Sequence, residues 1–83
     1  MGAGVEIHGS SGEPLLLVAV EYDASDNAVY VGESAPGTSQ SSIGWRIKKI
    51  TYDASNNATD VKWANGDHNF KNVFDDRAGY SYS

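Results

Sequence analysis

The sequence predicts an all-β fold, a small antiparallel barrel or two-layer sandwich of five to six strands, with an extended N-terminal arm. Three observations lead to this prediction. Apolar runs of strand length are rich in Val, Ile and aromatic residues. Clusters of Gly, Asn, Asp and Ser separate these runs and favour turns. Two nearly identical segments, YDASDNA at 22–28 and YDASNNA at 52–58, each join two such runs, which predicts a pair of matching hairpins.

The length and composition predict a single domain. A chain of 83 residues has no room for two independent cores. Residues 1–14 are rich in Gly and Ser and are interpreted as an arm, whereas residues 15–83 form the β domain. There is no cysteine, so disulfide bonds cannot reinforce so small a core. Oligomerisation is the most accessible remaining source of stability.

The first predicted strand follows the arm. The run LLLVAVEY at 15–22 is continuously apolar over its first six residues, which is typical of a strand buried on both faces. After the first turn comes AVYVGES at 28–34. There, Val29 and Val31 should face one way and Tyr30 the other.

The third run, GWRIKKITY at 44–52, carries a break in its alternation. Trp45 and Ile47 share one parity, whereas Ile50 and Tyr52 share the opposite one. A regular strand would therefore expose one of the two pairs to water. A bulge near Lys48–Lys49 would return both pairs to the inside, and we predict a bulge or sharp bend there.

The remaining connections are predicted from their turn residues. Pro36 and Gly37 fit the two central positions of a type II turn in a surface loop, and Asn65-Gly66 suits positive φ. Towards the end, the spacing of the residues from Phe70 to Arg77 predicts a helical turn or compact loop. The alternation of Tyr80 and Tyr82 predicts a closing edge strand.

The repeated turn has two interpretations. Oxygen-bearing side chains at alternate positions resemble the first half of a calcium-binding EF-hand loop. However, the sixth position lacks Gly in both copies, and the twelfth is Ser34 or Asn65 instead of a bidentate Glu. The simpler interpretation is structural: Asp23 and Asp53 accept backbone N–H groups of their own turns. We therefore predict no metal site.

No catalytic or cofactor site is predicted, and the chain is expected not to be an enzyme. His8 and His68 stand in polar segments, and neither can be placed with a nucleophile and an orienting group. Six basic against eleven acidic residues give a net charge of -5, which disfavours nucleic acid as a partner. The longest apolar run, Leu15 to Val20, is far shorter than the about 20 residues of a membrane span.

Aromatic residues divide into a predicted core and a predicted contact surface. Large side chains must supply most of the burial in so small a domain, and the expected core aromatics are Trp45, Trp63, Phe70 and Phe74. Tyrosine is favoured at protein interfaces. The residues expected to make interfaces are Val5 and Ile7 in the arm, Pro36 and Gly37 in the loop, and Tyr30, Tyr80 and Tyr82 on an outer face.

Three tracts give the sequence a resemblance to known proteins. They are LLVAVEYDASDNAVYVGESAPGT, WRIKKITYDASNNATDVKWANGD and the ending VFDDRAGYSYS. In this order, they resemble the short virion-associated accessory proteins of tailed bacteriophages, over nearly the whole of residues 15–83. The resemblance implies a head decoration, neck or fibre-associated subunit. Its location would be the virion, and its partners other virion proteins or further copies of itself on a symmetric particle.

A second class of function is compatible with the same composition. A small β domain with tyrosines on an outer face could instead bind carbohydrate or a receptor, such as a glycan of a host surface. Solvent-facing Trp or Tyr in the free chain would be its signature.

Overall fold

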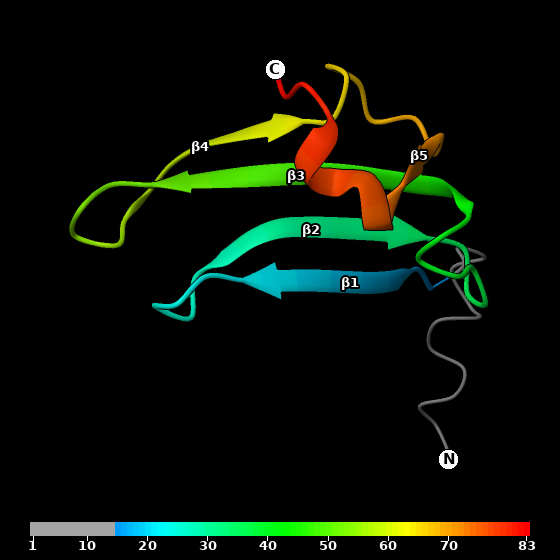
Figure 1. Cartoon of the computed structure of the whole chain (residues 1–83), viewed down its shortest axis with the longest axis horizontal. Helices are drawn as coiled ribbons and strands as arrows, with labels where there is room; N and C mark the ends of the chain where they lie inside the picture. Colours follow the sequence, from blue (N-terminus) through cyan, green and yellow to red (C-terminus); the bar gives the residue numbers. More distant parts are fainter. Residues whose placement is uncertain (1–14) are drawn as a thin grey trace, which may run out of the picture.

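The computed structural model describes residues 15–83 and confirms the predicted all-β fold, an antiparallel sheet of five strands with little helix. The predicted arm, with Val5 and Ile7, lies outside the described residues. The elements are β1 (Leu17–Tyr22), β2 (Ala28–Ser34), β3 (Ile43–Tyr52), β4 (Ala58–Trp63), β5 (Asn72–Val73) and the 3-10 helix η1 (Phe74–Gly79). Strands β1 to β4 form a meander, and β5 pairs with the beginning of β3 (Figure 1).

The two repeated segments form the turns of two matching hairpins. Asp26 and Asn56 adopt φ of 64° and 65°, the left-handed conformation that Asp and Asn tolerate. Each hairpin shifts register next to its turn, between Glu21 and Tyr22 in one and between Thr51 and Tyr52 in the other. Both turns lie at the same end of the sheet (Figure 1), because four strands of a meander alternate in direction.

The predicted bulge near Lys48–Lys49 is wrong. Lys48 and Lys49 pair in regular register with Val31 and Tyr30 on β2, and with Trp63 and Lys62 on β4. Strand β3 therefore keeps its alternation, and its two apolar pairs point to opposite faces of the sheet. The change of parity between Ile47 and Ile50 therefore arises because both faces of the sheet carry apolar side chains.

The core lies on one face of the sheet, beneath the C-terminal segment. It consists of Ala19, Trp45, Ile47, Ala64 and Phe74. We call this the covered face, because the segment 72–83, including β5 and η1, lies over it (Figure 1). The rings of Trp45 and Phe74 pack with their centroids 5.4 Å apart, a favourable tilted arrangement.

Close packing under η1 depends on a glycine in β2. A Cβ atom on Gly32 would lie 2.5 Å from Cδ1 of Phe74, so the ring lies directly against bare backbone. An ion pair further fixes the segment: Nε of Arg77 donates to Oε1 of Glu21 on β1 at 2.6 Å. The end of the chain then pairs with β4, where Trp63 and Ser83 exchange backbone hydrogen bonds.

Two predictions about burial are wrong. Phe70 is 45% exposed and Trp63 lies outside the core, so only Trp45 and Phe74 of the four predicted core aromatics are core residues. Likewise, the apolar run at 15–22 is not buried on both faces. It forms the edge strand β1, where Val18 is 52% exposed. The continuous apolar run at 15–20 therefore belongs to a partly exposed edge strand, and not to a strand buried on both faces.

Candidate interaction surface

Apolar side chains line the face of the sheet opposite the core, which we call the open face. No strand or helix among residues 15–83 lies over it. The register places the following side chains on this face: Val18, Val20, Val31, Ile50, Val61 and Trp63. Three of them, Val18, Val20 and Val61, are exposed. The open face thus carries β-branched side chains that the described residues leave partly in contact with water.

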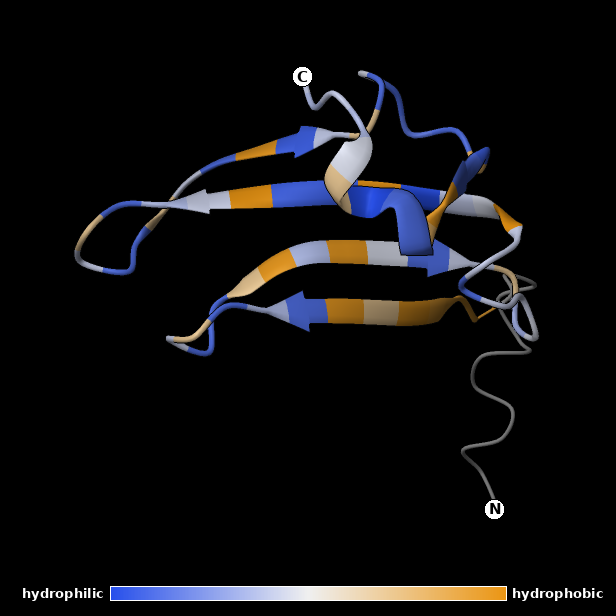
Figure 2. Ribbon diagram, in the orientation of Figure 1, coloured by the Kyte–Doolittle hydropathy of each residue, from blue (hydrophilic) through white to orange (hydrophobic). Residues whose placement is uncertain are grey.

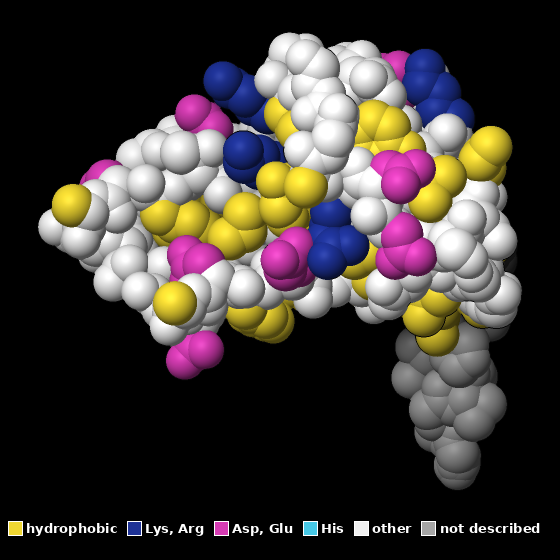
Figure 3. All heavy atoms as spheres, in the orientation of Figure 1, with side chains coloured by type: hydrophobic (Ala, Val, Ile, Leu, Met, Phe, Trp, Pro, Cys, Tyr) yellow, Lys and Arg dark blue, Asp and Glu magenta, His cyan; other side chains and the backbone are white. Residues whose placement is uncertain are grey.

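The exposed apolar side chains concentrate on β1 and at Leu15, two residues before it. Within residues 15–83, five of the eight exposed large hydrophobic residues fall here, and we call them the β1 patch: Leu15, Leu17, Val18, Val20 and Tyr22. Strand β1 is at the edge of the sheet, and β2 is its only strand partner within residues 15–83. In Figure 3, hydrophobic atoms emerge along the lower margin of the molecule, where Figure 1 places β1. An edge that is both unpaired and apolar favours association with another chain.

The opposite edge of the sheet, β4, has a different character. It carries the charged residues Asp60 and Lys62 on either side of Val61. Figure 2 shows the contrast: β1 is hydrophobic along most of its length, whereas β4 is mainly hydrophilic. Charged side chains on an edge strand disfavour pairing with other chains. Strand β4 carries two such charges, whereas β1 carries one, Glu21, which is paired with Arg77.

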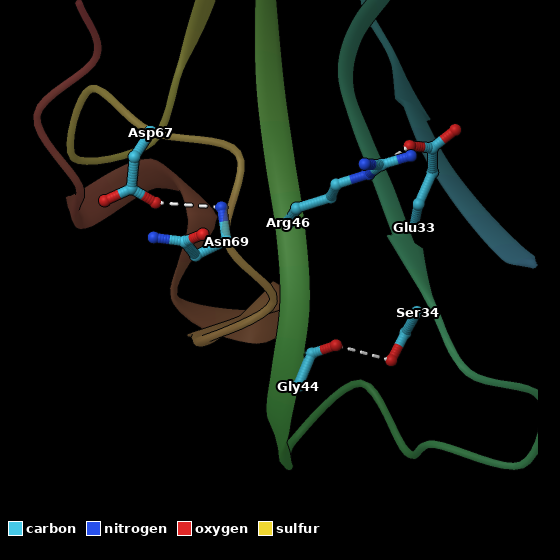
Figure 4. Close-up of polar contacts among 6 residues, drawn as sticks. All are labelled: Glu33, Ser34, Gly44, Arg46, Asp67 and Asn69. Carbon is cyan, nitrogen blue, oxygen red and sulfur yellow. Dashed lines mark hydrogen bonds and ion pairs between the residues drawn. The ribbon is translucent and has the colours of Figure 1, made fainter.

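Arg46 is surrounded by aromatic rings on the open face. Its guanidinium carbon lies 4.6 Å from the ring centroid of Phe70 and 5.9 Å from that of Trp63. Its Nε donates to Oε1 of Glu33 at 2.7 Å across β2 and β3 (Figure 4). The charge of Arg46 is therefore neutralised within the domain, and the cation holds the two aromatic side chains in place.

The repeated turns are built as predicted from backbone-binding aspartates. Oδ1 of Asp23 accepts the N–H groups of Ser25 and Asn27 at 2.8 and 3.0 Å, and Asp53 repeats this pattern in the second turn. The hydrogen bond from the Asn27 backbone lowers the pKa of Asp23, and the corresponding bond lowers the pKa of Asp53. Asn27 Nδ2 also donates to Asn56 Oδ1 at 3.0 Å, so the two turns contact each other.

Three of the predicted interface residues lie against the core. Tyr30, Tyr80 and Tyr82 are partly buried and pack on it, so the prediction that they stay on an outer face is wrong. Their hydroxyl groups serve the fold: Tyr80 accepts from the backbone of Val73, and Tyr82 donates to the carbonyl of Arg77. Burial accordingly raises the pKa of Tyr82. A role for these three in an interface stays a prediction.

The loop predicted to make contacts has the expected geometry. Pro36 and Gly37 are exposed, Gly37 has φ of 91°, and the N–H of Thr38 donates to the carbonyl of Ala35. This confirms the type II turn. The loop lies at the opposite end of the sheet from the paired turns (Figure 1).

The remaining polar candidates make local contacts. Asp67 forms an ion pair with Lys71 and accepts the N–H of Asn69 (Figure 4), and its neighbour His68 lies edge-on to Trp63. Across the described part of the chain, there is no pocket and no group of three or more His, Cys, Asp or Glu that could hold a metal ion. Nor does any described helix have the length and apolarity to cross a membrane.

Sequence reasoning missed the β1 patch as an interaction surface. The signal was present in the run at 15–20, but a continuous apolar run is equally typical of a central strand. Comparison with known proteins adds no further guidance, since no family model, curated protein or solved structure matches the chain.

Proposed function

We propose that this chain is a non-enzymatic structural subunit of a bacteriophage virion that docks in multiple copies on the particle. The β1 patch is the observation that carries this proposal. Its five side chains include Leu15 and Tyr22, which are 63% and 57% exposed. Contact of such a patch with water costs free energy in the free chain, and covering it on assembly recovers that free energy.

The small core supports the same proposal. Among the described residues, only five hydrophobic side chains are buried, and two of these are alanines. Domains of this size bury a smaller fraction of their surface than larger domains and gain from association. Docking among neighbours would add stability through mass action, because only the folded chain presents the docking surface.

The assignment to a bacteriophage particle rests on the sequence resemblance described above. That resemblance spans the order of the two hairpins, the Pro36-Gly37 turn and the C-terminal segment. A head decoration, a neck component and a fibre-associated subunit all fit a small β domain with an exposed edge. Its partners would be other virion proteins and further copies of itself.

The direct test is the quantity of this chain on purified particles. Gradient-purified particles of the phage that encodes it should carry many copies of the chain at a fixed ratio to the major capsid protein, as measured by quantitative mass spectrometry. Absence of the chain from washed particles would contradict the proposal.

A truncation tests the contribution of the arm. Deletion of residues 1–12 should leave a folded domain, with an unchanged far-UV circular dichroism spectrum, that no longer joins the particle. Normal incorporation of the truncated chain would show that the arm has no role in docking.

A carbohydrate- or receptor-binding module is the second candidate. The observation in its favour is that two aromatic side chains, Tyr22 and Phe70, are exposed, and that Arg46 lies over the rings of both Phe70 and Trp63. Binding of a host-surface glycan at the Phe70 side should change the fluorescence of Trp63, and Phe70→Ala should abolish that change. An unchanged spectrum across a panel of host saccharides would remove this candidate.

A further inference from the structure

We propose that β1 is a pairing edge for a second copy of this chain. Two β1 strands would join antiparallel about a twofold axis perpendicular to the sheet, so that two four-stranded meanders form one continuous sheet. This inference rests on the proposed role as a structural subunit and names the partner of the β1 patch.

The backbone and side chains of the β1 edge favour an extended apolar strand as its binding partner. In an edge strand, alternate residues leave their backbone N–H and C=O groups without a strand partner, and another strand satisfies them best. The flanking side chains are apolar on both faces, with Leu17 on the covered face and Val18 and Val20 on the open face. A second β1 carries the same two valines on its open face, so it matches this edge there.

For a second copy of the chain, charge favours the antiparallel orientation over the parallel one. The one charged residue within β1 is Glu21, and Arg77 neutralises it within its own chain. The acidic residues of the turns, Asp23, Asp26 and Asp53, lie at one end of the sheet. Antiparallel pairing places the acidic ends of two copies at opposite ends of the joined sheet, whereas parallel pairing would bring them together with repulsion.

Symmetry restricts the register. A twofold axis perpendicular to the sheet keeps each face on its own side, so only residues that share a face can pair. We take the axis at Ala19, which pairs residues 17–21 of the two copies, five of the six residues of β1. Val18 of each copy then lies opposite Val20 of the other on the open face, a favourable β-branched pair.

The oligomeric state of the full chain tests the proposal, with a closely matched control. Val18 and Val61 are both valines on the open face and are each 52% exposed, but Val18 is on β1 and Val61 is on β4. By sedimentation equilibrium, the wild type should be a dimer. Val18→Lys should weaken the dimer by at least about 100-fold, because each dimer would contain two lysines opposite valines. Val61→Lys should leave the dimer intact.

Cysteine pairing tests the register without relying on stability. The chain has no cysteine, so each introduced thiol is unique. A mixture of Val18→Cys and Val20→Cys chains should form a disulfide between the two variants on mild oxidation, and neither variant alone should form one. A disulfide within Val18→Cys alone or Val20→Cys alone would overturn the register centred on Ala19.

The outcomes separate this inference from the proposed function. A monomeric wild type, or equal dissociation by Val18→Lys and Val61→Lys, would overturn edge pairing even if the chain is found on particles. A dimer with the predicted cysteine pairing that is absent from particles would instead support edge pairing and contradict the virion role.

Discussion

The covered and open faces of the sheet carry apolar side chains alike, yet within residues 15–83 only the covered face lies beneath a helix, η1. On the covered face, Trp45 and Ile47 are completely buried beneath the segment that contains Phe74. On the open face, Val18 and Val61 remain half exposed. The difference teaches that residues 15–83 carry apolar side chains on both faces but place a helix over one of them, so that the other face and the β1 edge stay partly in contact with water.

The two tryptophans give the sharpest test of this contrast. Trp45→Ala should cost about 3–5 kcal/mol, because it empties the centre of the core. Trp63→Ala, on the open face, should cost less than half as much, since its side chain is only partly buried. Urea denaturation of both variants measures the difference. Equal losses of stability would mean that the open face is as well packed as the covered one.

A smaller effect is expected from adding one methyl group under η1. Gly32→Ala should cost about 1–3 kcal/mol, since the new Cβ would overlap the ring of Phe74. Gly79→Ala is the matched control, because nothing lies within 4 Å of a Cβ at that position. The thermal midpoints of the two variants should therefore separate. If the two midpoints coincide, the contact of Phe74 with Gly32 does not hold the segment 72–83 against β2.

The smallest effect concerns the repeated turns, which belong to neither face. The pKa values of Asp23 and Asp53 lie below their ordinary value of 3.8, so these carboxylates stabilise the fold above that pH. The contribution is lost as the pH falls through the lowered values and both groups are protonated. The double variant Asp23→Asn/Asp53→Asn should lose less stability between pH 5 and pH 2 than the wild type does.

Denaturation midpoints across that pH range measure the difference. Some acid sensitivity should remain in the variant because Asp67, whose pKa its hydrogen bond to Lys71 lowers, still titrates. Identical pH profiles for the variant and the wild type would show that the two turn aspartates contribute nothing.

Local features of the fold could be predicted from the sequence, because turn residues act through their own backbone. The hairpin turns around Asp23 and Asp53, the Pro36-Gly37 turn and the helical segment after Phe70 depend on φ preferences and short-range hydrogen bonds. The all-β class follows from these turns and from the length of the runs between them.

The arrangement of the faces could not be predicted, because burial depends on where each strand lies in the sheet. The apolar run at 15–20 is equally compatible with a buried central strand and with an exposed edge strand. Likewise, the change of parity between Ile47 and Ile50 fits either a bulge or two apolar faces. The order of strands, with β1 outermost, decides the first question and reveals the β1 patch, and the regular pairing of β3 with both neighbours decides the second.

The bare backbone at Gly32 also sets the alignment of the cover along the sheet. Its neighbours on the same face of β2 are Tyr30 and Ser34, and those across the strands are Ala19 and Ile47. A slip of η1 along β2 would lift Phe74 onto the Tyr30 ring or press it against the Ser34 hydroxyl. Because only Gly32 leaves room for the Phe74 ring, the absence of a side chain there fixes the position of the C-terminal segment along β2.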